Sequence, residues 1–132
     1  MHFIRFLLRM RKLKLPILIC IFFAITLFSC NNIRQEKFDK IKWKQHEDAG
    51  QPSSHRKRML EDLTTNYKLT EIKYSELVGL LGEPNFEDST SLGYDIIVDY
   101  GNDIDPVYTK ILKFIFSRDS IITSVKVNEW KK

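Results

Sequence analysis

Residues 74–84 read YSELVGLLGEP and contain the clearest helix start and stop signals in the chain. Ser75 has a hydroxyl that can accept a hydrogen bond from a free N–H group at a helix N-terminus. Gly82 can take the positive φ that closes a helix, and Pro84 prevents the helix from continuing. These signals predict a helix over residues 75–81. Its apolar stripe, at helical spacing, consists of Leu77, Leu80 and Leu81.

After this helix, apolar residues recur at every second position, which is the period of a β-strand. Three such runs cover residues 94–100, 111–116 and 121–128. The polar break at 117–120 predicts a hairpin turn between the second and third runs, and an acidic loop over 101–109 joins the first and second. The sequence therefore predicts three antiparallel strands. The inward-facing residues expected in the third strand are Ile121, Thr123, Val125 and Val127.

Upstream, another helix is expected to begin at Ser53 or Ser54, because either hydroxyl can cap a first turn. Its apolar residues at helical spacing are Met59, Leu60, Leu63 and Tyr67. The residues expected to face solvent are Arg56, Lys57, Glu61 and Asp62. One apolar face of the sheet needs covering, and both helices carry matching stripes. We therefore expect an α+β domain over residues 53–132, with two helices packed on a three-stranded antiparallel sheet.

The helix stretch and the last two strands also resemble a known family. Residues 74–84 are similar to the Ser-x-x-x-Val-x-x-Leu-(Leu)-Gly-x-Pro signature of the SmpA/OmlA (BamE-like) small outer-membrane lipoproteins. The later stretch 112–121, in which LKFIF precedes a polar turn with Asp119, looks like the family's closing strands. The resemblance covers residues 54–128. It implies an ααβββ order and a role in outer-membrane assembly, while the upstream helix looks more like lipoproteins of the Bacteroidetes type.

The N-terminus has the layout of a bacterial lipoprotein signal peptide. Its basic residues are Arg5, Arg9, Arg11, Lys12 and Lys14. The apolar run that follows, residues 15–28, is shorter than the roughly 20 residues of a spanning helix. Residues 27–30 read LFSC, which resembles a lipobox with a small residue before the cysteine. We predict that residues 1–29 are a signal peptide and that Cys30 carries acyl chains such as palmitate; an uncleaved membrane anchor is the alternative.

Removal of the signal peptide changes the charge of the chain. The full sequence has 21 Lys and Arg against 17 Asp and Glu, and loss of the five basic residues above leaves 16 against 17, a net charge of −1. The basic character of the precursor therefore gives no indication of nucleic-acid binding. Residues 30–52 are polar and predict a flexible tether. Within it, Phe38, Ile41 and Trp43 are expected to dock on the domain rather than sit at lipid headgroups.

The titratable residues of the mature chain form no pattern typical of catalysis or metal binding. His46 and His55 lie in or beside the tether, and their spacing fits no standard metal site. An EF-hand loop counted from Asp99 would need Gly and Glu at the positions that Ile104 and Lys110 occupy. We therefore expect no enzyme activity, no cofactor, no metal and no small-molecule substrate.

These observations favour a non-enzymatic interaction module, lipid-anchored in the cell envelope and expected on the outer membrane, facing the periplasm. Its expected partners are the membrane, through the anchor, and another envelope protein. The alternatives are a small binding or inhibitory module acting on an extracytoplasmic enzyme, a non-catalytic lipoprotein of another envelope complex and, last, a small hydrolase. The basic cluster at 56–58 is a candidate for contact with an acidic partner or anionic lipid. The alternative is an ordinary helix surface that faces solvent. The residues expected at a partner interface are Trp43, Arg56, Lys57, Arg58 and Trp130.

Overall fold

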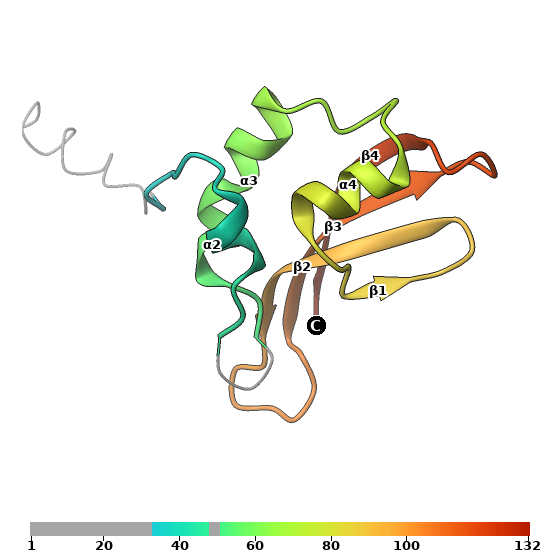
Figure 1. Cartoon of the computed structure of the whole chain (residues 1–132). Coiled ribbons are helices and arrows are strands. Elements are labelled where there is room, and N and C mark those ends of the chain that lie inside the picture. Colours follow the sequence, from blue (N-terminus) through green and yellow to red (C-terminus); the bar gives the residue numbers. More distant parts are fainter. Residues whose placement is uncertain (1–32, 48–50) are drawn as a thin grey trace, which may run out of the picture. The chain divides into compact units, whose positions relative to one another are not determined.

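The computed structural model of this chain describes residues 33–47 and 51–132 (Figure 1). Within it, Arg34–Lys132 form one unit with a shared hydrophobic core. The predicted signal peptide, residues 1–29, and the predicted lipidation site, Cys30, lie outside the described residues.

The described residues form an α+β fold in which helices cover one face of an antiparallel sheet (Figure 1). The helices are α2 (Lys40–Lys44), α3 (Ser54–Asn66) and α4 (Tyr74–Leu81). The strands are β1 (Phe86–Glu87), β2 (Ser91–Asp99), β3 (Tyr108–Phe116) and β4 (Ile122–Lys131). They lie in the sheet in sequence order, β1-β2-β3-β4.

The α+β class is confirmed, but the predicted set of two helices and three strands is incomplete. The additional helix, α2, lies in the segment predicted to be a tether, and the additional strand, β1, lies just after Pro84. In β1, Phe86 pairs with Gly93 at the edge of the sheet. Both elements are too short to show a periodic pattern, and they depend on contacts with the rest of the domain.

The ends of the two longer helices follow the chemistry of their flanking residues. α3 begins after Ser53, as predicted, and the Ser53 hydroxyl accepts a hydrogen bond from the His55 N–H. α4 begins at Tyr74, one residue earlier than predicted, and its N-cap is Lys73 with no side-chain hydrogen bond, so the predicted cap by the Ser75 hydroxyl is wrong. The Tyr74 N–H donates instead to the Ser120 carbonyl at 2.8 Å. Gly82 ends α4 with φ of 83°, so the predicted stop is confirmed.

Two β-bulges change which residues of the strands face the core. One lies between Asp95 and Ile97 in β2, and the other is opposite the Ile115–Phe116 step of β3. Because a bulge adds one unpaired residue, it reverses the alternation that the sequence predicts beyond it. In β4 the buried residue is therefore Ile122, whereas Thr123, expected to face inward, is exposed.

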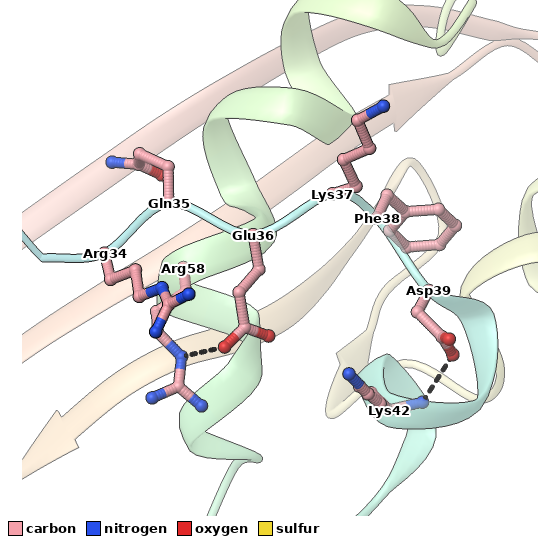
Figure 2. Close-up of a pocket in the computed structure, with 8 residues that line it drawn as sticks. All are labelled: Arg34, Gln35, Glu36, Lys37, Phe38, Asp39, Lys42 and Arg58. Atoms are coloured by element: carbon pink, nitrogen blue, oxygen red, sulfur yellow. Dashed lines mark hydrogen bonds and ion pairs between the residues drawn. The ribbon is translucent and has the colours of Figure 1, made fainter.

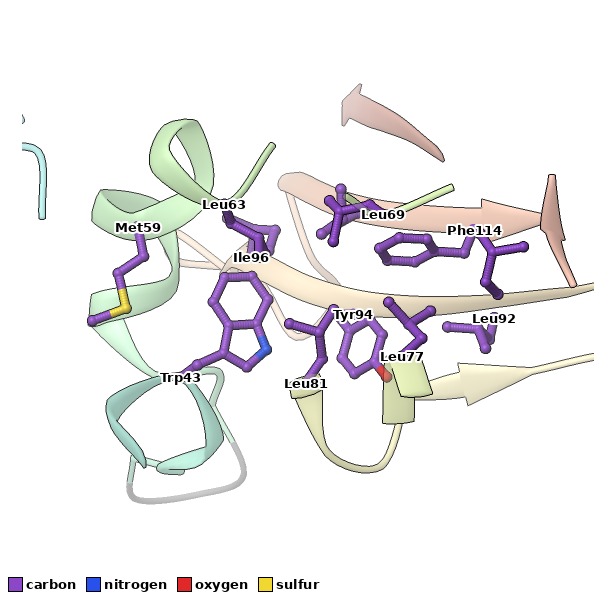
Figure 3. Close-up of a cluster of buried hydrophobic side chains, with 12 residues drawn as sticks. Trp43, Met59, Leu63, Leu69, Leu77, Leu81, Leu92, Tyr94, Ile96 and Phe114 are labelled. Atoms are coloured by element: carbon purple, nitrogen blue, oxygen red, sulfur yellow. The ribbon is translucent and has the colours of Figure 1, made fainter. Parts of the chain in front are cut away.

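The core lies between the helices and the sheet (Figure 3). The residues that the helices and the α3–α4 connection contribute are Trp43, Met59, Leu63, Leu69, Leu77 and Leu81. Those from the sheet are Leu92, Tyr94, Ile96, Leu112, Phe114 and Ile122. Several aromatic rings meet edge to face, including Tyr94 and Phe114 with centroids 6.0 Å apart. Among the described residues, no helix covers the opposite face of the sheet (Figure 1).

Candidate functional site

The segment that precedes α3 is packed on the domain rather than free. Trp43 of α2 is fully buried beside Tyr94 (Figure 3). The centroid of its ring lies 6.5 Å from that of Tyr94 and 5.7 Å from that of Phe38. Docking of Phe38 and Trp43 is thus confirmed. Ile41 is 75% exposed, so the same prediction is wrong for Ile41.

Arg56 joins this segment to the sheet from inside the domain. Its Nε donates to the Trp43 carbonyl at 2.9 Å, and its Nη1 donates to Asn85 Oδ1 at 3.0 Å and to the Asp95 carbonyl at 2.9 Å. The guanidinium also lies 5.3 Å from the centre of the Trp43 ring, within cation–π range. Burial lowers the pKa of Arg56, but an arginine stays charged in proteins. The buried charge is therefore balanced by carbonyl oxygens and an aromatic face.

Glu36 clamps the start of the segment to α3. Its Oε1 lies 2.8 Å from Arg58 Nε, and its Oε2 lies 2.9 Å from His55 Nδ1. Its backbone N–H donates to the Arg58 carbonyl at 2.9 Å. The hydrogen bond with His55, followed by the charge of Arg58, lowers the pKa of Glu36. The carboxylate is therefore engaged within the domain.

Beside this clamp is an open hollow of about 580 Å³ (Figure 2). Its lining residues are Arg34, Gln35, Glu36, Lys37, Phe38, Asp39, Lys42 and Arg58. Asp39, like Glu36, is engaged locally, since it accepts from the backbone N–H groups of Ile41 and Lys42. Within the described part of the chain, Arg34, Lys37 and Lys42 form no ion pair. The hollow therefore has an excess of positive charge.

The structure separates the five residues predicted to form one interface. Trp43 and Arg56 are buried, so the prediction that they are exposed to a partner is wrong. Successive residues of a helix point about 100° apart, and Arg56 therefore points into the core although its neighbour Lys57 does not. Lys57 is exposed, and Arg58 turns toward Glu36. Trp130 is 51% exposed on the uncovered sheet face, where it pairs with Thr109.

The set of cations around the hollow was not predicted from the sequence. Arg34, Lys37 and Lys42 are separated by other residues, and they come together because α2 folds the segment back on itself. One local signal was available: Asp39 is a good N-cap residue, and the basic and apolar residues of a short amphipathic turn follow it. The partnership of Glu36 with Arg58 has no local signal.

The described residues form neither a metal site nor a membrane-spanning helix. No group of three or more His, Cys, Asp or Glu residues in ranges 33–47 and 51–132 is placed to hold a metal ion. Asp103 of the acidic loop pairs with Lys132 at 2.8 Å. In the same ranges, no helix has the length and apolar character needed to cross a membrane.

Comparison of the chain with protein-family models, with curated proteins and with solved structures finds no match.

Proposed function

We propose that this chain is a lipid-anchored, non-enzymatic interaction module of the bacterial cell envelope, attached through Cys30 and acting in outer-membrane assembly or maintenance. The observation that carries the proposal is the LFSC sequence at residues 27–30, which follows a basic segment and an apolar run too short to span a membrane.

The finer BamE-like assignment belongs to the same proposal. The succession α3, α4, β2, β3 and β4 gives the ααβββ order of that family, with α2 and β1 as additions. In this assignment the domain faces the periplasm and docks on another envelope protein. Crosslinking in intact cells followed by mass spectrometry identifies that partner. Recovery of a single extracytoplasmic enzyme, with inhibition on binding, would favour an inhibitory module instead.

The anchor is tested by labelling cells with a fatty-acid analogue. We expect the Cys30→Ser variant to take up no label and to remain as the uncleaved precursor, because the serine oxygen does not replace the sulfur that forms the thioether. Cys20→Ala is the matched control, since it removes the other cysteine of the chain, and it should label normally. Continued labelling of Cys30→Ser would contradict the proposal.

A further inference from the structure

We propose that the basic hollow of Arg34, Lys37, Lys42 and Arg58 binds the phosphates of anionic phospholipid headgroups and holds α2 against the membrane surface. This inference rests on the proposed lipid anchor for its location. It adds to the anchor a second, electrostatic attachment that fixes which side of the domain faces the lipid.

The hollow carries an excess of positive charge. Four cationic side chains line it together with two carboxylates. Both carboxylates are already engaged, Glu36 by Arg58 and His55 and Asp39 by backbone N–H groups at 2.9 and 3.0 Å. The remaining cations, Arg34, Lys37 and Lys42, are exposed and can contact an anion from outside the domain. Arginine and lysine donors suit phosphate oxygens, which accept several charge-assisted hydrogen bonds at once.

An exposed apolar side chain lies beside these cations. Ile41 projects from α2 with 75% of its area exposed, and it lies between Lys40 and Lys42 in the sequence. Aliphatic side chains flanked by lysines are typical of segments that lie in a membrane interface, with the apolar groups at the acyl boundary and the charges among the headgroups. Binding of a soluble phosphate compound would leave Ile41 exposed to water, whereas binding to a membrane surface would bury it.

The hollow is also close in sequence to the predicted anchor at Cys30. Arg34 lies four positions after Cys30 and Lys37 lies seven positions after it, so a fully extended backbone spans at most about 14 Å and about 25 Å respectively. A lipid anchor at Cys30 therefore keeps these cations near the headgroups. The attraction of a basic residue to an anionic surface falls off over about 10 Å, so these charges act when α2 lies against the surface, which the short connection to Cys30 allows.

The test uses the full chain, processed and lipidated in a bacterial host and reconstituted into vesicles. An Ile41→Cys substitution supplies the only free thiol of the mature protein, because the sulfur of Cys30 is then in a thioether. An environment-sensitive fluorophore on this thiol reports contact with lipid. Vesicles of phosphatidylcholine are compared with vesicles in which one third is phosphatidylglycerol, and brominated acyl chains serve as quenchers.

The variant to compare carries Arg34→Gln, Lys37→Gln and Lys42→Gln, and leaves Arg58 in place because Arg58 holds Glu36. The matched control removes three charges elsewhere, with Lys113→Gln, Lys126→Gln and Lys131→Gln. We expect the emission of the fluorophore at residue 41 to shift to the blue, and to be quenched by the brominated chains, on anionic vesicles only. Each cation removed from the hollow should lower the ratio of docked to undocked protein by about fivefold, and the control should dock normally.

Several outcomes would overturn the inference. One is a fluorescence response on neutral vesicles as large as that on anionic vesicles. The others are no response on anionic vesicles, and a loss of docking in the control variant as large as that in the hollow variant. Reversal by inorganic phosphate at constant ionic strength would mean that the hollow takes free phosphate. Absence of lipid contact together with crosslinks from residue 41 to a protein in cells would identify an acidic protein as the occupant. Failure of the anchor has a separate readout, because the protein would then not float with neutral vesicles.

Discussion

At the scale of single residues, Gly82 connects the end of α4 to the core. Its φ of 83° and ψ of −169° lie in a region that is essentially restricted to glycine. Its carbonyl accepts a hydrogen bond from the Tyr94 hydroxyl at 2.8 Å. Burial raises the pKa of Tyr94, so the hydroxyl keeps the proton that it donates. Gly82 therefore ends the helix and also satisfies a buried polar group.

A substitution at Gly82 should accordingly be far more costly than one at Gly79 in the same helix. We expect Gly82→Val to lower the free energy of unfolding by on the order of 1–3 kcal/mol, because a Cβ there is strained and approaches Lys44 Cγ to 3.2 Å. Gly79→Ala should raise it by about 0.5–1 kcal/mol, since a methyl group at Gly79 meets no atom within 4 Å beyond its chain neighbours and the backbone of α4. Urea unfolding measures both. Equal shifts would show that the conformation of Gly82 is not needed.

Arg56 is the residue whose environment differs most from the sequence-based expectation, and its geometry leads to a second prediction. Arg56→Lys keeps the charge but cannot donate to all three acceptors from one planar group, so the buried Trp43 carbonyl or the partly buried Asp95 carbonyl loses its hydrogen bond from residue 56. We expect a loss of about 2 kcal/mol in the free energy of unfolding. Lys57→Gln, at the exposed neighbour, should stay within about 0.5 kcal/mol. Similar effects of the two substitutions would contradict the structural role of Arg56.

At the scale of elements, the β1–β2 turn depends on one carboxylate. Asp88 accepts hydrogen bonds from the backbone N–H groups of Thr90 and Ser91 and from both of their hydroxyls, at 2.7 to 3.2 Å. The bond from the Ser91 hydroxyl, followed by those from the two N–H groups, lowers the pKa of Asp88 from 3.8 to about 2. The ionised carboxylate is therefore the form that stabilises the turn.

The sign of the pH effect follows from that lowered pKa. The stability that Asp88 contributes is fully present above its ordinary pKa of 3.8 and is lost as the pH falls through about 2. We expect Asp88→Asn to melt at a lower temperature at neutral pH and to lose less on acidification than the parent chain does. Ser91→Ala should raise the pKa of Asp88, measured by NMR titration. An unchanged acid dependence of melting in Asp88→Asn would exclude this role.

The contrast between long and short elements explains how much of the fold could be predicted. α3, α4 and the three long strands carry enough residues for their periods to be read from the sequence. α2 has five residues and β1 has two, and their stability comes from Trp43 in the core and from pairing with β2. The bulges were also not predictable, because an unpaired residue is defined only against its partner strand.

At the scale of the whole molecule, the candidate site is distributed over positions that the sequence does not bring together. The sequence identified Arg58 as part of a basic cluster, but its partner Glu36 lies 22 residues upstream and Arg56 of the same cluster is internal. The exposed cations instead gather near α2, while the uncovered sheet face carries Trp130. The molecule thus presents two different surfaces, and the proposed functions assign one to lipid and leave the other for a protein.

The last prediction concerns that second surface. Trp130 pairs with Thr109 on the face away from the helices and is 51% exposed, and Trp43 finds its aromatic neighbours in Phe38 and Tyr94. We therefore expect Trp130→Ala to change the free energy of unfolding by no more than about 1 kcal/mol. If the sheet face docks on the envelope partner, the same substitution should strongly reduce crosslinking in intact cells, because tryptophan is prominent among residues that carry interface energy.

Val127→Ala is the matched control for this prediction, because Val127 lies on the same strand, is 43% exposed and points to the other face of the sheet. Val127→Ala should leave the amount of crosslinking to the partner unchanged. Equal losses of crosslinking in both variants would mean that crosslinking depends on the integrity of β4 and not on the sheet face that carries Trp130. A large fall in melting temperature for Trp130→Ala, with crosslinking reduced only in proportion, would make Trp130 a structural residue. Unchanged melting with lost crosslinking is the one result that places the partner on this face.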